Sequence, residues 1–259
     1  MTYGIRLRAW GALACFTRPE MKAERVSYDV MTPSAARGII ESVYWKPQIR
    51  WVIDRIHVLR PIQFASLRRN ELGSKIPAGA VESAMKNGAG ALGVFIEEGR
   101  QQRAATVLRD VEYIVEAHFD VLEARGSAGE SLGPKQAEAK HLDQFNRRAR
   151  AGQCFHRPYF GCREFACDFE LVAPGEPIGP RYGPPRDGSE VAEAFYGTDR
   201  ATRDLGFMLH DVAFIDDPAG EIVEGSAGRR VRAVPKFFRA RMDRGVIEVP
   251  RPDSGEVHS

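Results

Sequence analysis

The sequence predicts an α+β protein whose N-terminal part has a ferredoxin-like, RNA-recognition-type fold. Three observations support this: strand patterns that alternate every second residue, two helical patterns, and their order along residues 1–173, which is strand, helix, strand, insertion, strand, helix, strand. That order is the split β-α-β-β-α-β arrangement, which places both helices on one face of the sheet. The other face would be free to meet RNA or protein, although a fold alone does not establish a function.

The first three elements follow from hydrophobic periodicity. Residues 4–10 alternate apolar and polar side chains and predict a strand. A Thr-Pro-Ser start precedes a helix expected over residues 35–45, and Pro47 ends it because the residue before a proline leaves the helical region. Residues 49–59 are rich in Trp, Ile and Val and predict a long second strand.

A long insertion is expected over about residues 63–105. Six glycines and several basic residues replace regular periodicity there. Loops of this length inside compact domains are usually functional or disordered. We expect a mobile hairpin.

The second half of the N-terminal domain repeats the strand–helix–strand order. Residues 111–121 alternate clearly, with Val111, Tyr113 and their apolar successors on one face. Residues 135–151 predict a helix with Leu142, Phe145 and Ala149 as its apolar stripe, and residues 160–172 predict a strand. The predicted ferredoxin-like domain therefore covers residues 1–173.

The rest of the chain predicts a small antiparallel β-sheet domain over residues 189–250. Five prolines and four glycines mark residues 174–188 as a linker or ordered loop. Strands are expected over 205–215, 231–242 and 246–249, with a turn at 243–245. Residues 251–259 are expected to be a disordered tail.

The composition is that of an ordinary globular protein. The net charge is +2, so any nucleic-acid site must come from local clustering of basic residues. No apolar run reaches the roughly 18 residues of a membrane span, and Arg6 and Arg8 interrupt the apolar N-terminal stretch where a signal-peptide core would lie. We expect a cytoplasmic protein with no membrane partner.

The cysteines leave two interpretations open. Cys154, His156, Cys162 and Cys167 form a candidate metal cluster, but their spacing lacks the paired C-x2-C of strong zinc sites. In the other interpretation the four cysteines, Cys15 included, are reduced and largely buried thiols. We favour thiols and expect no metal and no cofactor.

Two features suit chemistry on RNA. Tyr44 and Lys46 end the first helix, and Lys140-His141 lie near the start of the second, followed by Arg147 and Arg148. Helices on one face of a sheet can bring such features together. Metal-free cleavage needs a base for the ribose 2′-hydroxyl, an acid for the leaving 5′-oxygen and a cation for the phosphate, which His, Tyr and Lys can supply.

Each of these residues also has an ordinary structural explanation. A histidine on a helix is usually a surface or capping residue, a tyrosine is usually a buried aromatic with a bonded hydroxyl, and a lysine is usually a solvated charge. His156 remains a rival to His141 because it is close to the second helix in sequence. Sequence alone does not choose between these interpretations.

A basic run near the C-terminus suits single-stranded RNA. Within residues 229–244, Asp243 is the one acidic residue and two phenylalanines interrupt the cations. Cations can bind phosphates and aromatic rings can stack on bases. A solvated strand face whose phenylalanines belong to the core is an equally good interpretation. The candidate RNA-binding residues here are Arg232, Lys236, Arg239 and Arg241.

The sequence also resembles the Cas-five family of CRISPR-associated proteins, in its type I-C (Dvulg) subtype. The most specific blocks are GIIESVYWKP at 38–47 and GCREF at 161–165. Other matching stretches are FTRP at 16–19, ERVSY at 24–28, LRPIQ at 59–63, LRDV at 108–111, AKH at 139–141 and FFRA at 237–240.

The resemblance implies a metal-independent endoribonuclease that replaces the Cas-six nuclease. Such a subunit cuts CRISPR precursor RNA at the 3′ base of the repeat hairpin and then holds the crRNA 5′ handle in a surveillance complex. By motif match, Tyr44, Lys140 and His141 fall on the family's catalytic positions. The implied partners are repeat RNA, a Cas-seven backbone subunit and a Cas-eight large subunit, with the residue 61–108 segment as a thumb-like hairpin that contacts the backbone subunits.

Two alternatives are compatible with the same sequence. One is a non-catalytic RNA-binding subunit that caps the crRNA 5′ handle, since the family contains members that only bind RNA. The other is an unrelated α+β enzyme with a small-molecule substrate, although the sequence has no phosphate-binding glycine loop, metal-ligand set or nucleophile motif for it.

Overall fold

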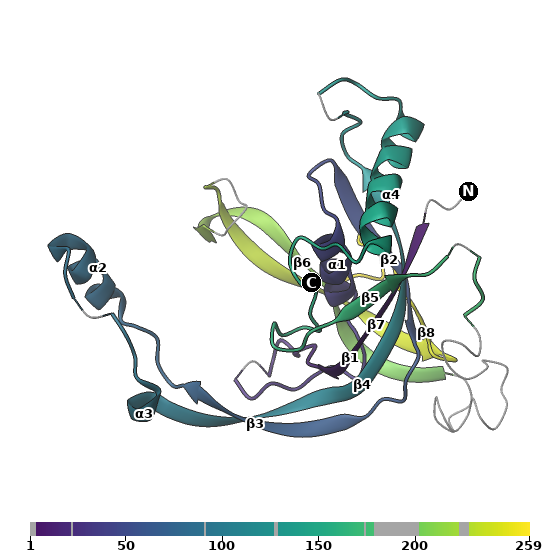
Figure 1. Ribbon diagram of the computed structural model, residues 1–259. Helices are drawn as coiled ribbons and strands as arrows, with labels where there is room; N and C mark the ends of the chain where they lie inside the picture. The colour runs from purple at the N-terminus through teal and green to yellow at the C-terminus, as the bar shows by residue number, and fades with distance from the viewer. Residues whose placement is uncertain are drawn as a thin grey trace.

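The computed structural model describes residues 4–21, 23–90, 92–126, 129–173, 175–178, 202–222 and 228–259. It is an α+β protein built on one curled sheet, with few helices (Figure 1). In chain order the elements are β1 Gly4–Ala14, α1 Pro33–Val43, β2 Ile49–Val58, β3 Phe64–Leu72, α2 Ala78–Asn87, α3 Ile96–Gly99, β4 Arg100–Val121, α4 Pro134–Arg150, β5 Asp168–Leu171, β6 Thr202–Ile222, β7 Arg230–Asp243 and β8 Val246–Glu248.

The strands are ordered β5-β1-β4-β2-β8-β7-β6, and β3 pairs with the first half of β4. Pairings between these strands are antiparallel. The predicted α+β class is confirmed, and the predicted order of strands and helices is the order along the chain. The ferredoxin-like assignment stays a prediction.

The C-terminal strands continue the same sheet. β8 pairs with β2 through Ile247 opposite Ile56, so β6, β7 and β8 join the N-terminal strands edge to edge. The sequence had predicted a separate small sheet packed on the first domain. The division into domains at 1–173 and 189–250 therefore stays a prediction, and the predicted linker at 174–188 lies outside the described residues except for 175–178.

Two sequence predictions are corrected by the structure. Regular strand covers only Asp168–Leu171 of the predicted 160–172, because Gly161 turns the chain with φ 79° and packs directly on the Cys15 carbonyl. The tail at 251–259 is ordered along β7, since Phe237 and His258 exchange backbone hydrogen bonds of 2.7 and 2.8 Å. The predicted turn at 243–245 is confirmed, with positive φ at Arg244 and Gly245.

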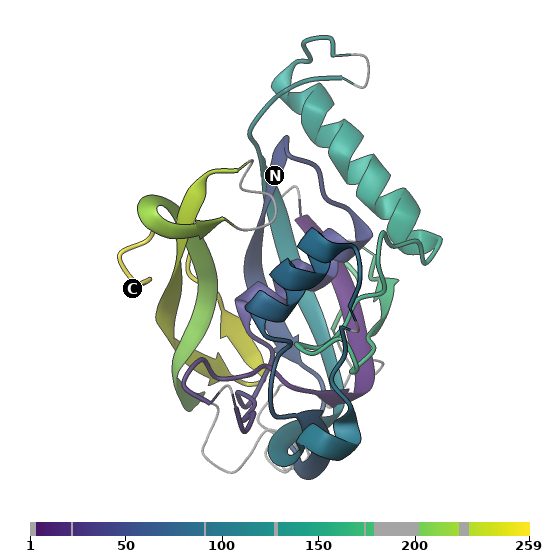
Figure 2. The same ribbon diagram turned by 90° about the vertical axis from the view of Figure 1, so that its left-hand side faces the viewer.

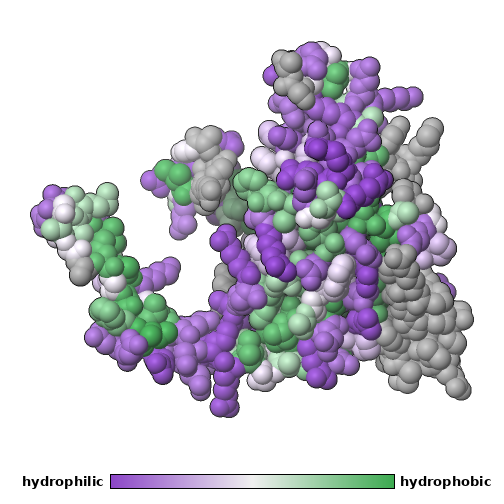
Figure 3. Space-filling view, in the orientation of Figure 1, coloured by the Kyte–Doolittle hydropathy of each residue, from purple (hydrophilic) through white to green (hydrophobic). Residues whose placement is uncertain are grey.

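The predicted insertion is a long hairpin. β3 and the first half of β4 curve away from the body, and the helices α2 and α3 lie at its tip (Figures 1 and 2). Figure 3 shows apolar side chains gathered on this tip. They are largely exposed and include Leu72, Ile76, Met85, Leu92 and Phe95.

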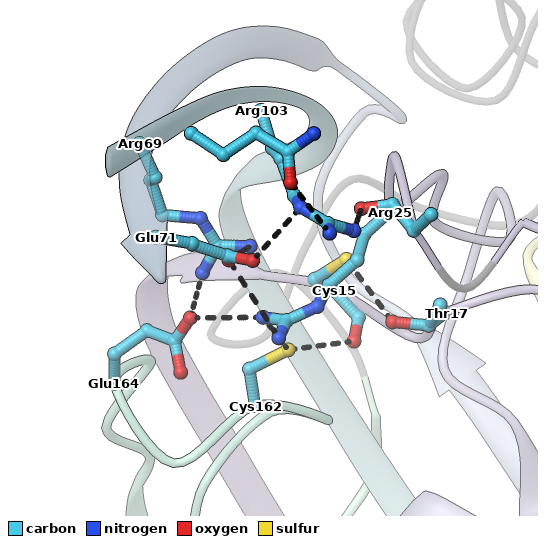
Figure 4. A network of polar contacts seen from close by, with 10 residues as sticks. Cys15, Thr17, Arg25, Arg69, Glu71, Arg103, Cys162 and Glu164 are labelled. Carbon is cyan, nitrogen blue, oxygen red and sulfur yellow. Dashed lines mark hydrogen bonds and ion pairs between the residues drawn. The ribbon is translucent and has the colours of Figure 1, made fainter. Parts of the chain in front are cut away.

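A polar network links this hairpin to neighbouring segments (Figure 4). Glu71 of β3 forms ion pairs with Arg25, Arg69 and Arg103, at 3.7–3.8 Å. Glu164 pairs with two of the same guanidinium groups, those of Arg25 and Arg69. Because these residues come from separate segments, the network ties the hairpin to the loop that precedes β5.

No helix within the described part of the chain is long and apolar enough to cross a bilayer. Cys15 and Cys167 are buried, Cys154 and Cys162 are half-buried, and all four are free thiols. Among the described residues, no three His, Cys, Asp or Glu side chains are grouped as metal ligands.

Candidate active site

The first half of the site is the end of α1. Thr32 caps the start of this helix by accepting a hydrogen bond from the Ala35 amide at 3.3 Å. Tyr44 caps its end in an extended conformation. Its carbonyl accepts a 2.9 Å hydrogen bond from the Trp51 indole of β2. The backbone around Tyr44 is thereby fixed to the sheet.

The second half of the site is the buried face of α4. Ala137, His141, Phe145 and Ala149 recur every four residues and are all buried. The sequence had predicted Leu142, Phe145 and Ala149 as the stripe, but Leu142 is only half-buried. His141 is therefore a member of the core-facing stripe and not a surface residue.

The two helices meet at Tyr44 and His141. The Tyr44 hydroxyl oxygen lies 2.7 Å from His141 Nδ1, within hydrogen-bond distance. Phe119 of β4 packs edge-on against the imidazole, with ring centroids 6.1 Å apart. Trp51 packs on both Phe119 and Phe145 at 5.1 Å, so aromatic rings support this pair from the sheet side.

Burial sets the protonation of both groups. His141 is 0% exposed and Tyr44 is 3% exposed. Burial lowers the pKa of His141, and the charges of Lys140 and Lys46 lower it further. Burial raises the pKa of Tyr44, against a smaller opposite effect of Arg148. At neutral pH the site therefore holds a neutral imidazole and a neutral phenol inside a positive field.

One imidazole nitrogen of His141 has no hydrogen-bond partner among the described residues. His141 Nε2 is buried and makes no hydrogen bond within the described residues. A buried polar atom left unpaired costs roughly 1–3 kcal/mol, so native proteins rarely retain one without a use. Nε2 is the atom of this site best suited to exchange a proton with a ligand.

Lys140 points elsewhere in this structure. Its ammonium group donates a 3.0 Å hydrogen bond to the Arg125 carbonyl, in the connection between β4 and α4. The structure thus brings Tyr44 and His141 together. Lys140 does not contact them through this bond, but its positive charge lowers the pKa of His141.

The helix-side candidates for RNA binding are Lys46, Arg147 and Arg148. Lys46 and Arg147 are exposed, and Arg148 is half-buried near Tyr44. Arg147 also bonds Gln144 of its own helix at 2.9 Å. Lys46 and Arg148 are the members of this group whose charge reaches the Tyr44–His141 pair.

The basic strand β7 is less free than its sequence suggested. Asp243 was its one acidic neighbour in sequence, but the partner strand β6 supplies further carboxylates. Arg239 pairs with Asp204 at 2.5 Å and Arg232 pairs with Asp217 at 3.0 Å. Phe238 is buried in the core, as the alternative interpretation expected. Lys236 is half-buried and Arg241 is exposed, so both stay candidates for RNA contact.

Sequence reasoning missed a hollow beside α1. This groove has a volume of about 640 Å³ and lies between the open side of α1, the loop at 155–161 and Leu209 of β6. Trp45 and Phe155 line it and remain largely exposed. His156, which the sequence left open as an alternative to His141 for catalysis, also lies here and is exposed. The exposed tryptophan in the Tyr-Trp-Lys-Pro block was the available signal.

Known proteins match this sequence along nearly the whole chain. The family model Cas5d, described as CRISPR-associated protein (Cas5), matches residues 4–250. A CRISPR pre-crRNA endoribonuclease Cas5d from Mannheimia succiniciproducens is 47% identical over 96% of both chains. A protein of the same name from Thermus thermophilus is 40% identical over 98% of this chain and 94% of its own.

Solved structures share the fold. The crystal structure of a functionally uncharacterized protein, SMU1763c from Streptococcus mutans, superimposes with a TM-score of 0.58 at 23% identity, covering 99% of this chain and 97% of its own. A structure described as a CRISPR-associated protein gives 0.55 at 20% identity, covering 99% and 96%.

Proposed function

Because the chain belongs to the Cas5d family of CRISPR-associated proteins, we propose that it is an endoribonuclease that cuts CRISPR precursor RNA within the repeat. The observation that carries the proposal is the 2.7 Å contact between Tyr44 and His141, on elements that the sequence separates by 97 positions. The relatives named as pre-crRNA endoribonucleases support the substrate class.

The chemistry that we propose needs no metal. The ribose 2′-oxygen forms a bond to the adjacent phosphorus, the P–O5′ bond breaks, and the products carry a 2′,3′-cyclic phosphate and a 5′-hydroxyl. His141 is the general base or acid, because its lowered pKa keeps the imidazole neutral near pH 7. The Tyr44 hydroxyl orients the imidazole or shares in proton transfer.

The tautomer of His141 decides its role. If Nδ1 donates its proton to the Tyr44 oxygen, then Nε2 carries the free lone pair and accepts the 2′-hydroxyl proton. If Tyr44 donates to Nδ1, then Nε2 carries the proton and donates a hydrogen bond to a phosphate oxygen, and the ring protonates the leaving 5′-oxygen only after it has taken up a second proton. In both cases Nε2 is the atom that faces the RNA.

RNA must open the site before it can react. His141 is fully buried in the free protein, and catalytic contacts often form only in the substrate complex. Lys140 would leave the Arg125 carbonyl and turn to the scissile phosphate. Lys46 and Arg148 would bind neighbouring phosphates, since their charges already reach the site.

We assign the long hairpin the role of a thumb in the assembled complex. Its exposed apolar tip (Figure 3) suits a contact with a Cas-seven backbone subunit. After cleavage the protein would hold the crRNA 5′ handle within a type I-C complex that also contains a Cas-eight subunit. The strand order β5-β1-β4-β2 supports a ferredoxin-like assignment for residues 1–173.

The test compares His141→Ala with His258→Ala on a cognate repeat RNA in EDTA. His258 is exposed and engages β7 through its backbone, so it is a matched control. We expect His141→Ala to abolish cutting while it binds the RNA within a few-fold of wild type. Cutting by His141→Ala would refute this assignment. No cutting by wild type, with tight handle binding, would favour the non-catalytic capping subunit.

A further inference from the structure

The groove beside α1 lies next to the candidate active site. Tyr44 is extended, so its side chain and that of Trp45 point to opposite sides of the chain. Tyr44 points inward to His141, whereas Trp45 lines the groove. A groove that begins one residue from Tyr44 is close enough to receive part of the same RNA.

Two large aromatic rings in this groove remain in water. Trp45 is 56% exposed and Phe155 is 87% exposed. The Phe155 amide donates a 2.7 Å hydrogen bond to the Ser42 carbonyl, which fixes its backbone to the last turn of α1. Exposed rings on a fixed backbone cost free energy in the free protein and are suited to stack on a flat partner.

Further ring contacts extend this surface. His156 lies with its ring centroid 6.2 Å from Phe155 and 6.2 Å from Tyr159. These three residues and Trp45 all line the groove. Successive rings of this kind are typical of proteins that bind splayed-out bases of single-stranded RNA.

The charges in the groove favour a nucleobase over a phosphate. No lysine or arginine is among the described residues that line it. Glu41 lines it and forms an ion pair with Arg37 at 2.8 Å, and Thr17 and Ser34 add hydroxyl groups. The Glu41 carboxylate can accept from the N–H groups of a base edge and would repel a phosphate, and the two hydroxyls can donate to or accept from a base edge. The cations that suit phosphates, Lys46 and Arg148, do not line the groove, and their charges act on His141 and Tyr44.

The size of the groove agrees with this occupant. Its volume of about 640 Å³ falls in the range of small-ligand sites, roughly 300–1,000 Å³. Gly38 faces it from the middle of α1, and a Cβ placed there would meet no atom within 4 Å. The floor of the groove is therefore open.

We propose that this groove holds the base of an unpaired nucleotide next to the scissile phosphate, stacked on Trp45 and Phe155. The inference rests on the proposed function, because that function supplies the RNA. It adds a specificity site: the base would fix the register of the RNA so that the neighbouring phosphate lies at His141.

The test uses repeat RNA with a 2′-deoxy substitution at the scissile nucleotide, so that it binds without reacting. 2-Aminopurine is placed in turn at each nucleotide beside the cleavage position. We expect binding to quench its fluorescence at one position, because stacking on an aromatic ring quenches it. An abasic nucleotide at that position should weaken binding by about 5- to 100-fold, as stacking of one base predicts.

The variants either fill the groove with a side chain or remove one of its aromatic rings. Gly38→Leu places a side chain on its floor and also favours the helix, so it should fold at least as well as wild type. Gly38→Ala is the matched small control. Trp45→Leu and Phe155→Leu remove the rings, and Phe214→Leu removes a 60% exposed ring on β6 outside the groove. We expect Gly38→Leu, Trp45→Leu and Phe155→Leu to lose quenching and to raise the KM of the cleavable RNA.

The outcomes separate this inference from the proposed function. Normal cutting by wild type, with no quenching and no effect of Gly38→Leu or the ring variants, would overturn the groove site and leave the nuclease intact. Quenching that Gly38→Leu abolishes, in a protein that does not cut, would retain the base site and overturn the nuclease. Absence of any RNA binding would overturn both.

Discussion

The hydroxyl of Tyr44 and the imidazole of His141 lie 2.7 Å apart at the junction of α1 and α4, and both are buried. This pair joins the end of α1 to the buried face of α4, the two elements that position the candidate catalytic side chains. Its outer ring nitrogen is unpaired among the described residues, and burial and the nearby cations keep the ring neutral.

Tyr44→Phe should reduce cutting without reducing RNA binding. The phenylalanine keeps the ring in its packed position but removes the hydrogen bond to Nδ1, so the imidazole loses its orientation. We expect the single-turnover rate to fall about 100-fold or more and affinity to change less than about threefold. Single-turnover cleavage and filter binding measure the two quantities.

Tyr113→Phe is the control for this variant. Tyr113 is also a buried tyrosine, and its hydroxyl bonds the Met31 backbone away from the site. Each variant should lose about 1 kcal/mol of stability, but only Tyr44→Phe should lose activity. Equal cutting by the two variants would remove Tyr44 from the mechanism.

Lys140→Gln should raise the pKa of His141. Burial is the larger cause of the lowered value, and the Lys140 charge is the next. Removing that charge makes protonation of the imidazole easier, so the pKa of His141 should rise. It should stay below the ordinary value of 6.5, because the effect of burial remains. NMR titration of the His141 ring measures the shift, with Lys135→Gln, at the exposed start of α4, as control. An unchanged titration would show that the Lys140 charge does not reach the ring.

The same shift has a consequence for stability. Because folding lowers the pKa of His141, the unfolded chain takes up a proton more readily than the folded one below pH 6.5. The contribution of His141 to stability is therefore complete above pH 6.5 and decreases as the pH falls. Urea unfolding of wild type and His141→Ala at pH 7.5 and 5.5 should show the difference between them narrowing at the lower pH.

Glu116→Gln should destabilise the sheet at neutral pH. Its carboxylate bonds His57 at 3.3 Å and pairs with Arg6 and Arg55, and these contacts lower its pKa to about 2. The side chain is 15% exposed, so we expect a loss of about 1–3 kcal/mol at pH 7. Because the folded pKa is lowered, the contribution is present above about pH 4.5 and is lost as the pH falls toward 2. Urea unfolding at pH 7 and pH 3 tests this, and an equal loss at both would contradict it.

Glu71→Gln should loosen the attachment of the thumb hairpin to its neighbouring segments without unfolding the body. Its three arginine partners are partly exposed, so the global loss should stay below about 1 kcal/mol. Hydrogen exchange should nevertheless become faster in β3, because the network of Figure 4 ties that strand to neighbouring segments. Glu82→Gln, at the tip of the hairpin, is the matched control. Unchanged exchange in β3 would show that strand pairing alone holds this strand in place.

Local patterns predicted the local parts of this structure. The spacing in α1 and α4 and the alternation in β1 are set by neighbouring residues, and these elements form close to where they were expected. β4 includes the predicted strand at 111–121 but begins at Arg100, where the sequence predicted part of the insertion. The prediction of the buried stripe of α4 nonetheless left out His141, because a histidine is not counted as apolar. Tertiary packing against Phe119 decides that His141 belongs to it.

Contacts between distant segments were beyond the sequence. The ion pairs of Arg239 and Arg232 depend on how β6 and β7 align, which the spacing along one strand does not specify. The alternation in 160–167 looked like a strand, but the close approach of Gly161 to Cys15 turns the chain there. The groove beside α1 also needs three separate segments to exist.

The most direct test of the central claim is the chemistry of the cut ends. Wild-type protein is incubated in EDTA with repeat RNA and, separately, with the same RNA lacking the 2′-hydroxyl at the scissile nucleotide. Mass spectrometry then determines the masses of the products. The account predicts a 2′,3′-cyclic phosphate and a 5′-hydroxyl from the first RNA and no cutting of the second. Cutting of the 2′-deoxy RNA, or a 5′-phosphate on the product, would contradict it.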